Sequence, residues 1–247
     1  MLKIDHHSES DCPHRRWRTA FLASALIHLL AAVALGVLAL AAPTLIHRFV
    51  FGPGHRRQVT QFESLAIHAT DVVFLGDSIT EAVQWHELFP SITTRNRGIG
   101  GDTSGEVLAR LDPILRGQPR KLFLMVGTND VRLGRSPETS MKDLETILER
   151  LQQEAPGTAV YVESVLPRSA RYAARIRAHN RRLEQVAQRH AATYLDLFDS
   201  FADERGAIRP EYSNDDLHLL GPGIQLWARL LAPYVLDDTA QAHPRSP

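Results

Sequence analysis

The sequence has only one cysteine, Cys12, among its 247 residues. Because a single thiol can form neither an internal disulfide nor a cysteine-based zinc site, neither of these cross-links is expected in the chain. Neither sign of charge is in excess, since 28 lysines and arginines face 28 aspartates and glutamates. The bulk charge gives no indication of an acidic partner, and no nucleic-acid partner is expected.

Hydrophobic residues make up 44% of the chain. This length and composition suffice for one good-sized α/β domain with an additional segment, and the chain is too short for two full enzymes. The domain contains no internal repeat and no low-complexity tract. We therefore expect one catalytic domain.

One long stretch near the N-terminus has almost no ionisable side chains. It covers residues 20–42, AFLASALIHLLAAVALGVLALAA, with His28 as its only ionisable side chain and Pro43 directly after it. As a helix it would be about 35 Å long, enough to cross a hydrocarbon core of about 30 Å. A soluble helix of this length normally has a polar face, which this one lacks. The stretch predicts a transmembrane signal anchor, although the small residues Ala39 and Ala41 leave signal-peptidase cleavage open.

The segments around this stretch complete the predicted organisation. Residues 1–19 form a short polar and basic segment, whose lysine and arginines together slightly outnumber the arginines after the stretch and favour a cytoplasmic N-terminus. The catalytic domain is then expected outside the cytosol, in a periplasm or at a cell surface, attached to the membrane by the anchor. Residues 43–60 would be a juxtamembrane linker, 61–236 the catalytic domain, and 237–247 a flexible tail.

Apolar runs and helical patterns alternate through the domain. The runs predict strands at 72–75, 122–126 and 160–165, with weaker strands near Arg95 and Tyr194. Apolar positions with helical spacing predict helices over 107–115 and 144–151, followed by helices at about 171–191 and 222–236. This alternation is typical of a parallel sheet with helices on its faces.

Four short segments carry side chains suited to chemistry: FLGDSIT (74–80), GIGGDT (98–103), GTND (127–130) and DDLH (215–218). Ser78 directly follows a predicted buried strand, at the sheet edge where open α/β folds bind their ligands, and this position suits a nucleophile. A serine there can also be a helix cap, because Ser78 and Glu81 have the spacing of a capping box. The second glycine of the G-x-S-x-G elbow is missing, which argues against the α/β-hydrolase family.

Gly101 and Asn129 are candidate hydrogen-bond donors to a developing negative oxygen. Gly101 precedes a second capping box, Thr103 to Glu106, so its N–H is expected near a helix N-terminus. Asn129 follows another predicted strand, and its amide can donate without carrying charge. Each has a plain alternative, a glycine turn for Gly101 and a turn asparagine for Asn129.

Asp215 and His218 are three residues apart, a spacing that lets a carboxylate contact an imidazole across one turn. A carboxylate on one ring nitrogen leaves the other nitrogen as a base. Asp216 is expected to face away from the ring. A surface ion pair or two ligands of a metal site are the alternatives, but no further histidine or carboxylate cluster accompanies the pair. We therefore expect no metal and no cofactor.

Together, Ser78, Gly101, Asn129 and His218 resemble the four defining residues of the SGNH, or GDSL-like, hydrolases. The stretches VLPR (165–168) and DLHLLGPG (216–223) are similar to blocks of the type Ib platelet-activating-factor acetylhydrolase catalytic subunits within that superfamily. The resemblance covers residues from about 71 to 234 and excludes the apolar stretch. One departure is Ile79, which stands where the GDSL string ends in leucine.

The resemblance implies a flavodoxin-like three-layer α/β/α fold with a parallel sheet of about five strands. It also implies metal-free ester hydrolysis, with Ser78 as nucleophile, His218 as base and then acid, and Asp215 as its orienting residue. The N–H groups of Ser78 and Gly101 and the amide of Asn129 would form the oxyanion hole.

We expect a serine esterase that removes short, acetyl-type acyl groups from a small-molecule, glycan or lipid ester. Two alternatives stay open. One is transfer of the acyl group to a sugar hydroxyl at the same site, and the other is a catalytically silent envelope domain that binds acylated ligands. The sequence leaves the oligomeric state undetermined.

Overall fold

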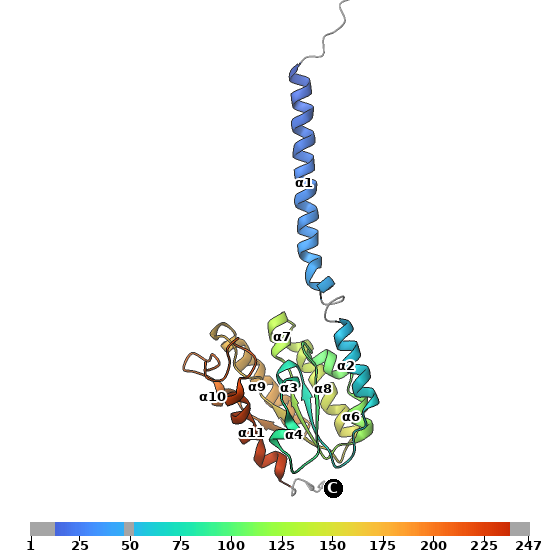
Figure 1. Cartoon of the computed structure of the whole chain (residues 1–247), viewed down its shortest axis with the longest axis vertical. Helices are drawn as coiled ribbons and strands as arrows, with labels where there is room; N and C mark the ends of the chain where they lie inside the picture. Colours follow the sequence, from blue (N-terminus) through green and yellow to red (C-terminus); the bar gives the residue numbers. More distant parts are fainter. Residues whose placement is uncertain (1–12, 47–51, 238–247) are drawn as a thin grey trace, which may run out of the picture. The chain divides into compact units, whose positions relative to one another are not determined.

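The computed structural model describes residues 13–46 and 52–237 (Figure 1). The chain separates into two compact units, with the division between Arg56 and Arg57. The first unit contains the long N-terminal helix and the start of the next helix, and the second contains the sheet and its covering helices.

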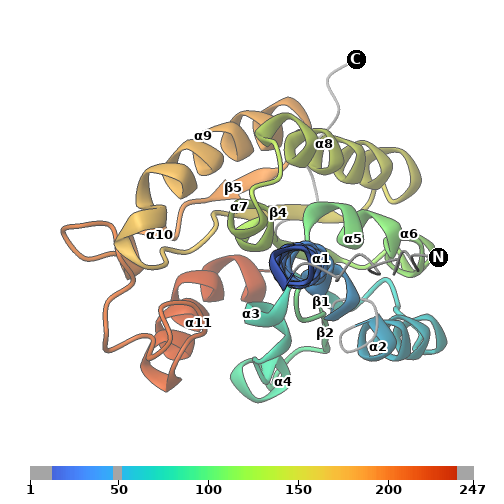
Figure 2. The same ribbon diagram turned by 90° about the horizontal axis from the view of Figure 1, so that it is seen from above.

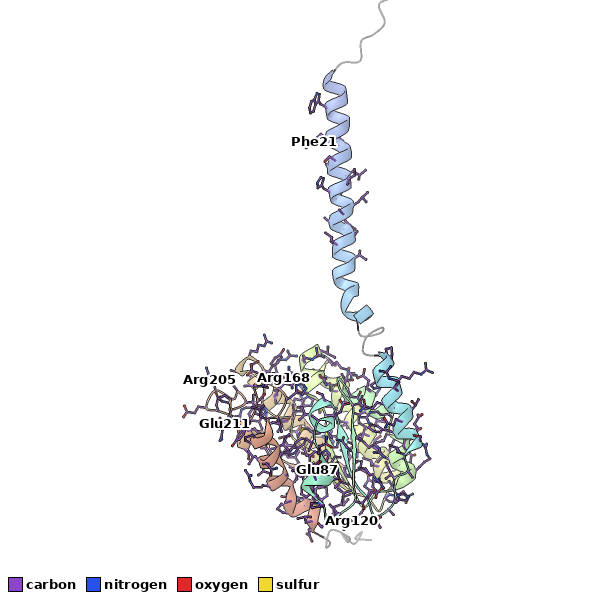
Figure 3. All side chains as sticks on the ribbon, viewed as in Figure 1. Phe21, Glu87, Arg120, Arg168, Arg205 and Glu211 are labelled. Carbon is purple, nitrogen blue, oxygen red and sulfur yellow. The ribbon has the colours of Figure 1, made fainter. Side chains whose placement is uncertain are left out.

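The N-terminal unit contains the long helix α1 (Pro13–Ile46), which continues past Pro43. Its described large side chains are exposed, including Phe21, labelled in Figure 3. Among the described residues, no helix combines the length and the apolar character needed to cross a membrane. The transmembrane anchor predicted over 20–42, and the membrane contact expected through it, are therefore not supported.

The predicted linker over 43–60 is largely helical. It contains the end of α1 and the first part of α2 (Gly52–Ser64), while residues 47–51 lie outside the described part. Of the predicted segment 1–19, residues 1–12 lie outside it, and so do residues 238–247 of the predicted tail. The one described tail residue, Asp237, accepts a hydrogen bond through its carbonyl oxygen from the buried Lys121.

Five parallel strands form the sheet, in the order β2-β1-β3-β4-β5. This is the flavodoxin-like order of doubly wound sheets. All residues of β1 and β3 are buried, because helices cover both faces of the sheet, and this explains their uninterrupted apolar runs. The predicted parallel sheet is confirmed, with strands β1 (Val72–Gly76), β2 (Thr94–Gly98), β3 (Lys121–Met125), β4 (Ala159–Glu163) and β5 (Thr193–Leu195).

Helices cover the two faces of the sheet in separate groups, as Figure 2 shows from above. Along β3, Leu122 and Leu124 pack into one hydrophobic cluster, and Phe123 and Met125 into another on the opposite face. The first cluster includes residues of α5 (Ser104–Ala109), α6 (Asp112–Gly117), α8 (Pro137–Glu154) and α9 (Ala173–Arg189). The second includes residues of α3 (Ser78–Glu81), α4 (Trp85–Leu88) and α11 (Gly221–Leu236). The shorter elements α7 (Thr128–Leu133), η2 (Ala170–Tyr172) and α10 (Phe198–Phe201) lie in the connections.

One predicted helix is wrong in its extent. The apolar stripe over 107–115 belongs to two short helices, because α5 ends before Arg110 and α6 begins with Pro113 in its first turn. A proline is favourable in a first turn but not in a helix interior, where it removes a hydrogen bond.

Aromatic rings and one buried acid connect the strands to α4 and α11. The Trp85 ring stacks on Phe74 of β1 at 3.7 Å, and Trp227 of α11 meets Trp85 edge-on at 4.8 Å. The Trp227 indole Nε1–H donates to Glu163 Oε2 of β4 at 2.6 Å. Burial raises the pKa of Glu163 to about 8, although the hydrogen bond from Trp227 acts in the opposite direction. Glu163 is therefore protonated in the folded protein near neutral pH.

This raised pKa predicts a pH-dependent contribution to stability. Below pH 4.5, Glu163 is protonated in both the folded and the unfolded protein. As the pH rises from 4.5 to 8, only the unfolded chain ionises, so the free energy of unfolding falls by up to about 1.4 kcal/mol per pH unit. Asp77, with its pKa raised to about 7, contributes to the slope in the same range. Glu163→Gln, which keeps an acceptor for Trp227, is therefore expected to make the slope shallower in urea unfolding measured between pH 5 and 8.

Glu149→Gln, an exposed substitution on α8, is the matched control and should leave the slope as in the unmodified protein. Equal slopes in the Glu163→Gln and unmodified proteins would contradict the raised pKa.

Candidate active site

Ser78 lies at the carboxyl end of β1, where the buried strand passes directly into α3. The helix cap is Asp77, whose Oδ1 accepts from the backbone N–H of Ile79 at 3.0 Å. The alternative of Ser78 and Glu81 as a capping box is therefore wrong, and the Glu81 carboxylate instead accepts from Gln58 Nε2 at 2.7 Å. Because Asp77 caps the helix, the Ser78 hydroxyl is available for another contact.

That contact is with His218, 140 residues further along the chain. Ser78 Oγ and His218 Nε2 lie 2.9 Å apart. On the other side of the ring, His218 Nδ1 lies 2.6 Å from Asp215 Oδ2. The three side chains thus form one line of hydroxyl, imidazole and carboxylate, in which the carboxylate favours a proton on Nδ1 and leaves Nε2 able to accept one from the serine.

Asp215 is held in place by its own loop. Its Oδ1 accepts from the backbone N–H groups of Leu217 at 3.0 Å and His218 at 2.7 Å. Burial opposes its charge, but hydrogen bonds from the ring and backbone of His218 outweigh burial and lower the pKa of Asp215 to about 2. Asp216 takes a left-handed conformation with φ of 61°, so the chain turns sharply between the two partners. It is Asp215, as expected, that contacts the ring.

The glycine loop after β2 passes beside the serine. A Cβ added to Gly100 would lie 3.8 Å from Ser78 Cβ. Gly101 has φ of 87°, a conformation that favours glycine, which has no Cβ to clash with its own backbone. The capping box from Thr103 to Glu106 is present, with the Thr103 N–H donating to Glu106 Oε2 at 2.8 Å. The loop that carries Gly101 is therefore fixed at the start of α5.

Asn129 is joined to the same loop. It lies in the first turn of α7, and its Nδ2 donates to the backbone oxygen of Asp102 at 3.0 Å. The structure thus brings the predicted residues to one edge of the sheet. Ser78, His218 and Asp215 are in direct contact, Gly101 belongs to the loop beside Ser78, and Asn129 binds that loop one residue further on.

Sequence reasoning missed a group of buried acids behind the site. Asp102 accepts from Arg110 Nε at 2.6 Å, and Arg110 Nη2 donates to the Gly76 carbonyl at 2.9 Å. Asp130 accepts from Ser104 Oγ at 2.7 Å. These acids are direct neighbours of predicted site residues: Asp77 precedes Ser78, Asp102 follows Gly101, and Asp130 follows Asn129. Their position in the motifs is the signal by which the sequence could have identified them.

Asp77 has the most altered titration of these acids. Burial raises its pKa to about 7, and the negative charges of Asp102 and Asp130 act in the same direction. The Ile79 N–H and the neighbouring His218 act in the opposite direction. The acid next to Ser78 therefore titrates near neutral pH.

No group of three or more histidine, cysteine, aspartate or glutamate side chains in the described ranges is arranged to hold a metal ion. The expectation of a site without metal or cofactor stays a prediction.

Comparison with known proteins identifies the family. Residues 74–226 match the model of the GDSL-like Lipase/Acylhydrolase family, which covers all of the site residues. The chain belongs to this family. The predicted resemblance is therefore confirmed, and the protein is a serine ester hydrolase of the GDSL-like type.

Relatives of this GDSL-like enzyme include acetylhydrolase subunits. The chain is 30% identical to the human platelet-activating factor acetylhydrolase IB subunit alpha1 over 182 residues, which is 69% of this chain and 78% of the relative. It is also 30% identical to subunit alpha2 from Rattus norvegicus over 174 residues, 66% of this chain and 73% of the relative.

Solved structures share the fold. A platelet-activating-factor-type protein from Streptococcus pneumonia matches with a TM-score of 0.71 and 28% identity, over 78% of this chain and 98% of that one. A GDSL-like lipase from Bacteroides thetaiotaomicron matches with a TM-score of 0.66 and 24% identity, over 74% of this chain and 97% of that one.

Gly127, two residues before Asn129, provides a test of how tightly this edge is packed. Its φ is 130°, and an added Cβ would lie 2.5 Å from His179 Nε2 and 2.9 Å from Val165 Cγ2. Gly127→Ala is expected to lower the free energy of unfolding by about 2 kcal/mol or more. The alanine would strain the backbone at this φ, and its Cβ would clash with the two neighbouring side chains. Ester hydrolysis should fall as well, since the turn carries Asn129.

Gly157→Ala is the control, because a Cβ there meets nothing within 4 Å. The stabilities of both variants are measured by urea unfolding. Equal unfolding midpoints for the Gly127→Ala and Gly157→Ala proteins would contradict the expected strain and clash at Gly127.

Proposed function

We propose that this GDSL-like enzyme removes acetyl or similarly short acyl groups from esters through an acyl-serine intermediate on Ser78. The observation that carries the proposal is the line of contacts from Ser78 Oγ to His218 Nε2 at 2.9 Å and from His218 Nδ1 to Asp215 Oδ2 at 2.6 Å. The side chains of His218 and Asp215 are each close to half exposed, so the line can be reached by a dissolved ester.

In the first half-reaction, Ser78 Oγ attacks the ester carbonyl carbon while His218 Nε2 takes the hydroxyl proton. The tetrahedral intermediate then collapses, and His218 returns the proton to the leaving alcohol. In the second half-reaction, water attacks the acyl-serine, with His218 again as base and then as acid. Asp215, whose pKa is lowered to about 2, stays ionised throughout and stabilises the imidazolium.

The negative oxygen of the intermediate needs donors, and the proposal assigns this role to the N–H groups of Ser78 and Gly101 and to the Asn129 amide. Asn129 Nδ2 carries two N–H bonds, of which one is directed at the Asp102 carbonyl. The other would donate to the oxyanion. Its attachment to the loop beside Ser78 supports this role, because a donor that is already oriented needs no rearrangement during the reaction.

The acetyl preference is supported by the relatives. The human and rat proteins, each 30% identical to this chain, are named as acetylhydrolase subunits. Location of the catalytic domain outside the cytosol stays a prediction from the sequence.

Replacement of the nucleophile is the direct test. Ser78→Ala is expected to abolish hydrolysis of p-nitrophenyl acetate and covalent labelling by a fluorophosphonate probe, because both need the serine oxygen. Ser64→Ala, an exposed substitution on α2, should keep both. The unmodified enzyme should hydrolyse the acetate faster than the octanoate. Full activity in Ser78→Ala would overturn the mechanism, and a preference for octanoate would overturn the short-acyl assignment.

The oxyanion donor is tested separately. Asn129→Ala is expected to lower kcat by about 10²- to 10³-fold while KM changes little, because the lost hydrogen bond forms fully only in the transition state. Steady-state kinetics with p-nitrophenyl acetate make the measurement, and urea unfolding shows whether the loop stays folded. An unchanged kcat in a folded Asn129→Ala protein would remove Asn129 from the oxyanion hole.

A further inference from the structure

Arg168, at the end of the VLPR stretch, is held in place but not neutralised. Its Nη1 donates to Thr128 Oγ1 at 3.4 Å, and its Cζ lies 4.9 Å from the centre of the Tyr172 ring. The buried Nε has no hydrogen-bond partner, and the guanidinium forms no ion pair with a carboxylate of the described residues. Because arginine stays charged and carries five N–H donors, most of its hydrogen-bonding capacity is unused.

Two further arginines lie close to it. Arg171 Cζ is also 4.9 Å from the centre of the Tyr172 ring, and Arg132 Nε donates to Asn129 Oδ1 at 3.4 Å. Neither pairs with a carboxylate in the part of the chain that the structure describes. Burial lowers the pKa of Arg168, and the positive charges of Arg132 and Arg171 lower it further.

Several other arginines of this domain pair with acids. Arg95 pairs with Asp71 at 2.9 Å, Arg135 with Asp143 at 2.8 Å, and Arg150 with Glu154 at 2.8 Å.

Some other arginines, such as Arg97, Arg116 and Arg229, also lack a carboxylate partner among the described residues. The three arginines here differ because their guanidinium groups gather around Tyr172 and Asn129. Such a group of unpaired guanidinium groups is typical of a site that receives its negative charge from a ligand.

The cluster lies beside the proposed oxyanion donor. Thr128, which accepts from Arg168, directly precedes Asn129, and Arg132 contacts Asn129 itself. In Figure 3 Arg168 lies at the end of the domain opposite to Arg120, which precedes the first residue of β3. Arg168 therefore belongs to the carboxyl edge of the sheet, as does Ser78.

We propose that Arg168, Arg132 and Arg171 form a subsite for an anionic group, a sulfate, phosphate or carboxylate, on the alcohol part of the ester. This inference rests on the proposed function for its assignment to one part of the substrate. An acetyl group carries no charge, so the anion has to be on the alcohol. The planar guanidinium of Arg168 can donate two parallel hydrogen bonds to such an oxyanion, and Tyr172 keeps the plane in position.

Kinetics on a matched pair of acetyl esters test the subsite in the full chain. The pair is 4-acetoxybenzenesulfonate, which is anionic, and 4-acetoxybenzenesulfonamide, which is neutral and has a similar leaving group. The unmodified enzyme is expected to favour the sulfonate in kcat/KM. Arg168→Gln should lower the ratio of the two kcat/KM values by about 10- to 100-fold, as expected for loss of a charged hydrogen bond.

Arg168→Lys, which keeps the charge but not the planar fork, should retain part of this ratio. Arg116→Gln, which removes an exposed charge from α6, should leave the ratio unchanged. An unmodified enzyme without the preference, or an unchanged ratio in Arg168→Gln, would overturn the proposal.

Binding without turnover separates this proposal from the esterase mechanism. Ser78→Ala is expected to bind benzenesulfonate in calorimetry, more weakly at high salt, and the added Arg168→Gln change should weaken this binding about tenfold or more. If no ester is hydrolysed but this binding difference is found, the proposed function fails and the anion site stands. Equal binding by Ser78→Ala and Ser78→Ala with Arg168→Gln would overturn the subsite. Should Arg168→Gln not fold, the comparison is made with Arg168→Lys.

Discussion

The contact between Ser78 and His218 depends on how two distant parts of the chain are fixed against one sheet. Ser78 is placed by β1, whose residues are all buried. His218 lies three residues before α11, and α11 is held to β4 by the hydrogen bond between Trp227 and Glu163 and to α4 by the contact of Trp227 with Trp85. A hydrogen bond of 2.9 Å between the serine and the histidine therefore requires the packing of the whole α11 face.

The choice of helix cap shows how adjacent residues divide the roles at this edge. Asp77 and Ser78 are both good capping residues, and a cap of either kind contributes about 1 kcal/mol. Asp77 takes the cap, at the cost of burying a carboxyl group whose pKa rises to about 7. The serine hydroxyl is then free to face the imidazole. Local preference alone does not distinguish the two residues, whereas in the fold Asp77 caps the helix and Ser78 contacts His218.

The strands, and the gathering of the predicted site residues at one edge of the sheet, could be predicted because each depends on a local pattern. Buried parallel strands read as apolar runs, and the site residues lie in short motifs at the ends of those runs. The division between α5 and α6, the pairing of Asp102 with Arg110, and the contact of Glu163 with Trp227 could not be predicted, because the partners come together only through tertiary packing. The transmembrane anchor predicted over 20–42 is not supported by the described residues.

Equal numbers of acidic and basic residues describe the chain as a whole but not the carboxyl edge of the sheet. There the acids are directed inward: Asp77 caps α3, Asp102 pairs with Arg110, and Asp130 accepts from serines and Arg135. Because these carboxylates are committed to holding the loops of the site, they do not neutralise Arg168 and its neighbours. The carboxyl edge is therefore locally positive around Arg168, although the whole chain is neutral. This local charge acts over the short distances at which an ester is recognised.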